Sequence, residues 1–215
     1  MKKGFTLAEV LITLGVIGVV AALTIPTVIS KYQERVTVSK VKEIYSIMSQ
    51  AFLLSVKDNG YANEWNVGNG ENATTAIQIA NYLKPYLKIA KDCGINSGCL
   101  KYTESTNLLN GKRHVNYDGN KNYYKMILLD GSYIFIRGTF NYCQTNEGGV
   151  VDSCGAIFID MNGGTTPNTF GKDLFVFRIT PFAIKPSIDN SCLLNSTGSG
   201  CSGYILKNNN MDYLH

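Results

Sequence analysis

The sequence is poor in net charge and in histidine. Its formal charge is +4 over 215 residues, and the basic residues are spread along the chain, so composition gives no argument for nucleic-acid binding. The histidines are His114 and His215, and no Ser or Cys nucleophile motif lies beside His114. An exported enzyme is therefore a weak interpretation. No cysteine pair has the C-x-x-C spacing, which argues against zinc.

Charge is missing altogether from Val10 to Ser30. At about 1.5 Å per helical residue, this run is long enough to cross a hydrocarbon core of roughly 30 Å. An ordinary secretory signal has a shorter apolar region followed by a small-x-small cleavage site, which residues 21–25 imitate only loosely. Lys2 and Lys3 would keep the start of the chain in the cytoplasm and place everything after Ser30 outside it.

Glu9 lies at the start of this apolar run. An unpaired acid inside a bilayer costs about 2.5–3.5 kcal/mol on insertion scales, so it needs a partner. The spacing alone leaves two interpretations open. Glu9 either pairs with a cation of a neighbouring chain or lies at the headgroup level of a single membrane anchor.

Met1 to Glu9, read as MKKGFTLAE and followed by the apolar run, resembles the leader of type IV prepilins and type II secretion pseudopilins. The resemblance implies cleavage by prepilin peptidase after Gly4 and N-methylation of the new amino terminus, Phe5. Ala8 stands where this family often has a larger aliphatic residue. Glu9 matches the acidic position of the family, and its partner would be the amino group of Phe5 on a neighbouring subunit.

The resemblance and the hydrophobic pattern divide the chain into four parts. Residues 1–4 are a cleaved leader, and 5–30 are the transmembrane and filament-core half of a long helix. Residues 31–58 are its amphipathic half, and 59–215 are a disulfide-bonded globular head. The apolar positions that predict the buried face of the amphipathic half recur at three- and four-residue spacing; they are Val41, Ile44, Tyr45, Met48, Phe52 and Val56.

The head is predicted to contain one helix and several antiparallel strands. Ala76, Ile79, Ala80, Leu83 and Leu87 predict the buried side of a second helix, which Pro85 shortens. The expected strands are Tyr123 to Leu129 and Ser132 to Arg137, joined by an Asp130-Gly131 turn, then Ala156 to Asp160, Leu174 to Ile179 and a short final strand at Tyr204 to Leu206. A long helix followed by a small antiparallel sheet is an α+β fold. It matches the lollipop shape that the pilin resemblance implies.

All the cysteines follow the apolar run, and they are Cys93, Cys99, Cys143, Cys154, Cys192 and Cys201. An even number confined to the exported part of a chain indicates disulfides in an oxidising compartment. Pairing of sequence neighbours would close three short loops, with Cys93 to Cys99 as a tight loop rather than a secondary-structure element. Fifteen connectivities are formally possible for six cysteines.

The segment Asp160 to Asp173 resembles a D-x-N-G…P-N-x-x-G-x-D loop of many bacterial prepilin-like proteins. Several pseudopilins hold calcium in a loop on this side of the domain, and Asp160, Asn162 and Asp173 could supply oxygen ligands. In the competing interpretation, Asn-Gly and Pro-Asn set turns and the aspartates bind their own backbone. The sequence favours the turn interpretation, and no cofactor is required.

Together these features predict a structural subunit of a type IV pilus or of a type II secretion pseudopilus, without catalysis. The alternative is a minor pilin whose head binds DNA, a surface or an exported substrate, although Tyr123, Tyr124 and Tyr133 are better explained as sheet residues than as a stacking platform. The expected partners are prepilin peptidase, other pilin-like subunits, an assembly platform protein and inner-membrane lipid, and nucleic acid is not expected. The expected location is the bacterial inner membrane, with the head outside the cytoplasm and a filament after assembly.

Overall fold

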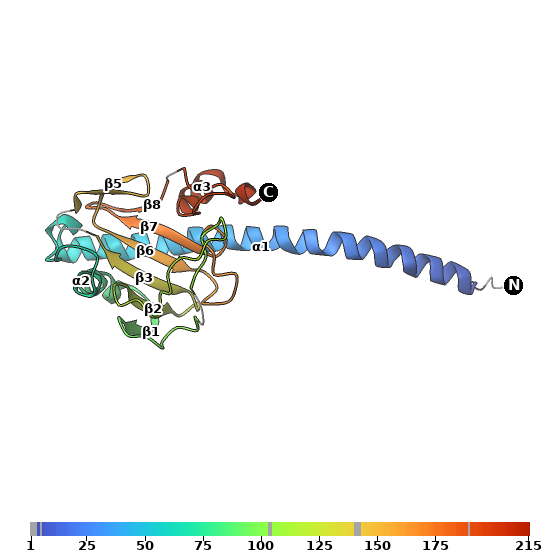
Figure 1. The fold of residues 1–215 in the computed structure, drawn as a ribbon, viewed down its shortest axis with the longest axis horizontal. Helices are drawn as coiled ribbons and strands as arrows, with labels where there is room; N and C mark the ends of the chain where they lie inside the picture. The colour runs from blue at the N-terminus through green and yellow to red at the C-terminus, as the bar shows by residue number, and fades with distance from the viewer. Residues whose placement is uncertain (1–3, 5, 103–104, 140–142, 189) are drawn as a thin grey trace. The chain divides into compact units, whose positions relative to one another are not determined.

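The computed structural model describes residues 4, 6–102, 105–139, 143–188 and 190–215. The chain forms two compact units, Met1–Val36 and Thr37–His215, and the second is called the head unit below. Helix α1 (Leu7–Asn59) is a single element of 53 residues that contributes to both units (Figure 1). The long N-terminal helix predicted from the sequence is therefore confirmed.

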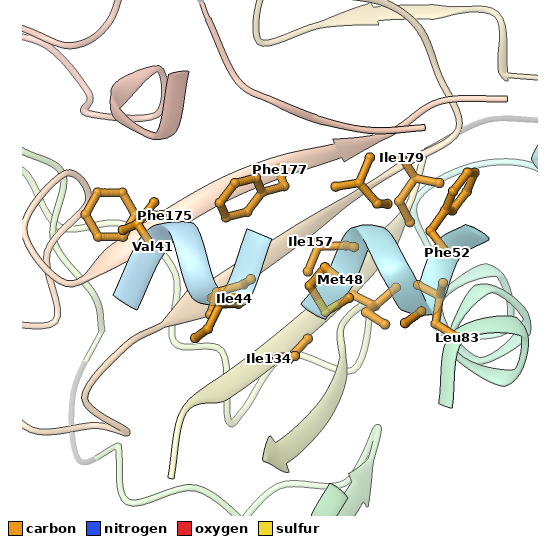
Figure 2. Packing of buried hydrophobic residues seen from close by; sticks show 14 of the residues in the cluster. Val41, Ile44, Met48, Phe52, Leu83, Ile134, Ile157, Phe175, Phe177 and Ile179 are labelled. Carbon is orange, nitrogen blue, oxygen red and sulfur yellow. The ribbon is translucent and has the colours of Figure 1, made fainter. Parts of the chain in front are cut away.

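Within the head unit, α1 buries one stripe of side chains against the sheet. The buried positions are Val38, Val41, Ile44, Met48, Ala51, Phe52 and Ser55. Their three- and four-residue spacing places them on one face of a helix. Figure 2 shows Val41, Ile44, Met48 and Phe52 beside the apolar side chains of the strands. The helix ends where Gly60 takes a φ of +80° and its N–H donates to Val56 O at 2.9 Å.

Six strands form one antiparallel sheet in the order β1-β2-β3-β6-β7-β8. Their bounds are β1 (Ile89–Gly94), β2 (Tyr124–Leu128), β3 (Tyr133–Gly138), β6 (Gly155–Asp160), β7 (Leu174–Ile179) and β8 (Ile184–Pro186). The predicted hairpin is confirmed as β2 and β3. Its turn depends on Gly131, whose φ of +85° is readily adopted only by glycine. The α+β class is likewise confirmed.

The sheet is covered on both faces. Successive side chains of a strand point to opposite faces, so Ile134, Ile136, Ile157 and Ile159 join α1 and α2 in one core, while Phe135 and Phe158 belong to a second cluster on the other side. In this second cluster, the ring of Tyr117 stacks on that of Phe135 with 4.3 Å between their centroids. Burial on both faces explains why β6 and β7 consist almost entirely of buried residues.

A loop layer covers the second face, and a buried lysine holds it in place. Lys125 of β2 is fully buried, and its Nζ donates to the carbonyl oxygens of Asp118 at 2.8 Å and Ile95 at 3.1 Å. The carboxylate of Asp118 accepts N–H groups from Gly98, Cys99 and Leu100 at 2.6–3.1 Å. These bonds fix irregular backbone against the sheet without a helix.

Helix α2 (Ala73–Leu83) packs on the same face as α1 and confirms the predicted helix, although Leu87, predicted on its buried side, lies beyond its end. Asn72 caps its N-terminus by accepting from Thr75 N–H at 3.0 Å. The helix gives way to a 3₁₀ turn, η2 (Lys84–Tyr86), which contains Pro85. The close approach of α2 requires Gly138 in β3, because an added Cβ would lie 2.7 Å from Thr75 Cβ.

The C-terminal segment differs from the sequence prediction. The expected strand at Tyr204 to Leu206 is wrong, because these residues lie in helix α3 (Cys201–Asn208). Cys201 and Ile205 are fully buried one helical turn apart, and Asn209 ends the helix with a φ of +63°. Tertiary packing of one helical face overrides the local β-branched and aromatic signal.

Four further strands were not foreseen. Cys93 lies inside strand β1 and pairs with β2 through its neighbours, so the interpretation of Cys93 to Cys99 as a loop alone is wrong. Strands β4 (Thr145–Glu147) and β5 (Val150–Ser153) form a separate hairpin. Strand β8 adds a short edge to the main sheet. Strands β4, β5 and β8 are three or four residues long, too short for a periodic signal to stand out. Strand β1 is mostly exposed and lacks the apolar run of the predicted strands.

Candidate functional site

The first helical turn is organised by Thr6 and Glu9. Thr6 N–H and Oγ1 donate to Glu9 Oε2 at 2.8 and 2.9 Å, and Glu9 N–H donates back to Thr6 Oγ1 at 3.3 Å. This reciprocal arrangement is a capping box, which satisfies backbone donors left free at a helix start. The Thr-x-x-Glu spacing is visible in the sequence and was missed. Gly4 is exposed, whereas Phe5 lies outside the described residues.

The apolar half of α1 exposes its side chains. Leu11, Ile12, Ile17 and Leu23 are 61–72% exposed, and the helix is long and apolar enough to cross a membrane. The hydroxyls of Thr13 and Thr24 donate to carbonyl oxygens of their own helix at 2.9 Å. Polar groups satisfied within the segment are what a bilayer requires. Apolar surface on this scale needs lipid or other chains to cover it.

The six cysteines form three disulfides. They are Cys93–Cys99, Cys143–Cys154 and Cys192–Cys201, which is the neighbour pairing expected from the sequence. Each closes a short loop, and the three lie in the head unit. A chain with every cysteine in a disulfide belongs in an oxidising compartment.

The loop between β6 and β7 brings Asp160, Asn162 and Asp173 together. Asp160 accepts N–H groups from Asn162, Gly163 and Gly164 at 3.0–3.3 Å and the hydroxyl of Tyr102. Across the loop, Asp173 accepts from Asn168 N–H, Thr169 N–H and Asn162 Nδ2 at 2.6–3.0 Å. These bonds support the turn interpretation.

Calcium binding by Asp160, Asn162 and Asp173 stays a prediction. Among the described residues, no group of three or more His, Cys, Asp or Glu side chains is placed to hold a metal ion. The carboxylate oxygens are engaged by loop N–H groups, which a cation would have to displace or share. A calcium titration of the unfolding midpoint would decide the question.

Burial of Asp173 is expected to make the stability of the folded protein depend on pH. Burial, together with the charge of Asp160, raises the pKa of Asp173 from 3.8 to about 6. The folded state therefore binds a proton at a higher pH than the unfolded state, and this contribution to stability is full below pH 3.8 and is lost as pH rises through about 6. Burial raises the pKa of Asp160 in the same direction.

Asp173→Asn should remove the larger part of that dependence. Between pH 7 and pH 4, the wild-type protein should gain on the order of 2–3 kcal/mol of unfolding free energy relative to the variant. Urea unfolding can be followed by the fluorescence of Trp65, the single tryptophan, which is 6% exposed. All other titrating groups are common to both proteins, so equal pH slopes would contradict the assignment.

A buried ionic cluster attaches the β4–β5 hairpin to the main sheet. Glu147 of the hairpin contacts the guanidinium of Arg137 in β3, and its Oε2 lies 2.7 Å from Arg178 Nη1 in β7. The side chains of Arg137 and Arg178 are 12% and 6% exposed. Glu71 supplies a more exposed second carboxylate 3.3 Å from Arg137 Nη1.

Backbone contacts hold the same hairpin close to Arg178. Ile188 N–H donates to Gly148 O at 2.9 Å. A Cβ at Gly148 would lie 2.7 Å from Ser187 Oγ and 2.8 Å from Arg178 Nε, so only glycine fits between the hairpin and the sheet. Sequence reasoning missed the whole cluster, because its charges come from distant segments.

The tyrosines weighed for nucleic-acid binding and the histidine weighed for catalysis pack against other side chains. Tyr123, Tyr124 and Tyr133 are 4–6% exposed, so they are core residues of the sheet rather than a platform for bases. His114 lies edge-on to Phe170, with 5.2 Å between the ring centroids.

Two protein families match parts of the chain. Residues 1–25 match the prokaryotic N-terminal methylation motif, and residues 27–192 match a family described as a family of unknown function (DUF6613). No curated protein and no solved structure matches. The methylation motif is typical of type IV pilins and pseudopilins and implies processing by prepilin peptidase. The motif, the apolar helix and the disulfides indicate a membrane-anchored, extracytoplasmic, pilin-like protein.

Proposed function

This chain belongs to a family of unknown function (DUF6613), so its role has to be inferred from the N-terminal segment and the fold, and we propose that it is a pilin-like structural subunit. Prepilin peptidase cuts after Gly4, and the subunit is stored in the inner membrane. It then assembles into a type IV pilus or a type II secretion pseudopilus. The observation that carries this proposal is the methylation motif at residues 1–25, which continues directly into the exposed apolar half of α1.

The exposed apolar surface supports both states of such a subunit. In the membrane, lipid covers the side chains from Leu7 to Ile29. In a filament, the same surface packs against neighbouring helices. Gly15 and Gly18 have no atom of another segment within 4 Å of an added Cβ, so neighbouring backbones can approach there.

Glu9 has one further role in this proposal. Its carboxylate caps its own helix through Thr6 and, in the filament, pairs with the amino group of Phe5 on the adjacent subunit. Burial of an acid among apolar helices is tolerated when a cation compensates its charge. Such a pair would set the axial register of the subunits.

The test is the mass of the amino terminus in membrane-extracted protein. With prepilin peptidase in the cell, we expect a chain that begins at methylated Phe5, and without it a chain that begins at Met1. Gly4→Leu should give the uncut form even with the peptidase present, because a bulky residue replaces the small one at the cut. An uncut chain in peptidase-containing cells, or cleavage near Ala22, would contradict the proposal.

A further inference from the structure

Ile188, the loop of residues 190–200 and helix α3 line an open groove of about 790 Å³ on the head unit. Its apolar wall includes Ile188 and Leu193, which are 59% and 64% exposed. Lys207 on α3 also lines the groove and is exposed. The volume of the groove lies within the roughly 300–1,000 Å³ typical of pockets that hold a bound group. We call this the α3 groove.

Two contacts hold the loop of residues 190–200 and helix α3 in place. The Cys192–Cys201 disulfide joins its loop to the first residue of α3. Gly203 N–H donates to Ser187 O at 2.9 Å, and a Cβ at Gly203 would lie 2.5 Å from that oxygen. A preformed groove loses little conformational freedom on binding.

A second exposed apolar feature lies elsewhere on the head unit. Tyr61 follows the end of α1, and Phe182 lies in the turn between β7 and β8. Their rings meet edge to face with 5.0 Å between centroids, although the residues are 47% and 65% exposed. Ala62 N–H donates to Pro181 O at 3.2 Å, which joins the two segments. We call Tyr61 and Phe182 the aromatic knob.

A carboxylate accompanies the aromatic knob. Glu64 Oε2 accepts the N–H of Tyr61 at 3.1 Å, and Glu64 is exposed. The knob therefore offers two aromatic rings and a negative charge, whereas the α3 groove offers apolar walls and the positive charge of Lys207. The two features are complementary in both apolar character and charge.

The knob and the groove are separate surfaces of the head unit. Lys42 of α1 donates to Asn209, which follows α3, whereas Tyr61 comes two residues after the end of α1 at Asn59. Seventeen residues of helix separate Lys42 from Asn59, or about 26 Å at 1.5 Å per residue. Figure 1 likewise shows α3 and the C-terminal end of α1 toward different ends of β7.

We propose that the aromatic knob of one copy of this chain inserts into the α3 groove of the next copy, with Glu64 facing Lys207. This inference rests on the proposed function, because a filament needs a contact between two different surfaces that repeats without closing. A contact between two different, complementary surfaces can repeat from copy to copy as an open series when its rotation does not close into a ring. Two identical surfaces facing each other would stop at a dimer.

Cysteine cross-linking between full-length copies tests the contact. Phe182→Cys and Leu193→Cys are placed in two differently tagged copies that are expressed together, and membranes are oxidised. We expect a mixed disulfide dimer at least tenfold more abundant than in the matched control, which pairs Phe182→Cys with Val151→Cys, a residue 57% exposed. Equal yields, a predominance of Phe182→Cys homodimers, or cross-linking only to a different protein would each overturn the contact.

Charge exchange provides the second measurement. Glu64→Lys and Lys207→Glu should each lower the yield of the mixed dimer severalfold, and the two together should restore it. If the two exchanges together do not restore the yield, the pairing of Glu64 with Lys207 is overturned. The mass of the amino terminus is measured in the same membranes, so the two proposals fail separately. A missing mixed dimer overturns the contact whatever that mass is, while a chain that still begins at Met1 overturns the proposed function.

Discussion

Replacing Glu147 with alanine is expected to lower the free energy of unfolding of the head unit by about 3–5 kcal/mol. Glu147 contacts both Arg137 and Arg178, whose side chains are 12% and 6% exposed. Without the shared carboxylate, two guanidinium groups stay close together in a nearly dry site. The cost comes mainly from leaving these two buried like charges close together without the carboxylate that both contact, and only in smaller part from the lost contacts.

Urea unfolding followed by the fluorescence of Trp65 measures the change. Trp65 stacks on Tyr82 with 4.4 Å between ring centroids, so loss of the core alters its emission. The matched control is Glu71→Ala, which removes a carboxylate from the same arginine. Glu71 is 48% exposed, and its loss should cost no more than about 1 kcal/mol. Equal effects of the two substitutions would show that Glu147 is not the central charge of the cluster.

The elements that the sequence predicted correctly are those with a strong local pattern. Val41, Ile44, Met48 and Phe52 repeat at helical spacing and are all buried, because one face of α1 packs on the sheet. The β2–β3 hairpin was predictable from Asp130-Gly131 between two apolar runs, since that turn chemistry is local. Such signals need no knowledge of distant residues.

The elements that the sequence did not predict depend on contacts between distant segments. Helix α3 is eight residues long and contains Gly203, so local propensity for helix is weak. It is held by the Cys192–Cys201 disulfide and by Ser202 Oγ, which donates to Val176 O and to Ser187 O. The Glu147 cluster likewise joins β3, β7 and a hairpin that no short-range pattern brings together.

The N-terminal capping box is a different case, because its signal was present in the sequence. Thr6 and Glu9 have the Thr-x-x-Glu spacing of a helix start. The apolar run that follows implies a cost for an acid in a bilayer, and the sequence predicted for Glu9 either a partner on a neighbouring chain or a place at the headgroup level. The structure adds an internal partner, so one carboxylate has two possible roles that a single substitution to alanine cannot separate.

Glu9→Gln separates these two roles and should abolish assembly while leaving the cap in place. Glutamine keeps an oxygen that can accept from Thr6 N–H and Oγ1, as Glu9 does at 2.8 and 2.9 Å, but it removes the charge that would pair with Phe5 of a neighbour. Breaking a buried ion pair costs about 3–5 kcal/mol. At 1.4 kcal/mol per tenfold change, the association constant should fall roughly 100- to 4,000-fold.

Thr6→Ala is the matched variant, because it disrupts the cap and keeps the charge. Loss of a capping side chain costs about 1 kcal/mol, so assembly should fall no more than about tenfold. Filament yield is compared for the two variants after mass measurement has shown that both begin at Phe5. Since the cap acts within one chain and the ion pair acts between chains, only the pair makes assembly depend on the charge of Glu9. Normal filaments from Glu9→Gln together with failed assembly of Thr6→Ala would assign Glu9 to the cap alone.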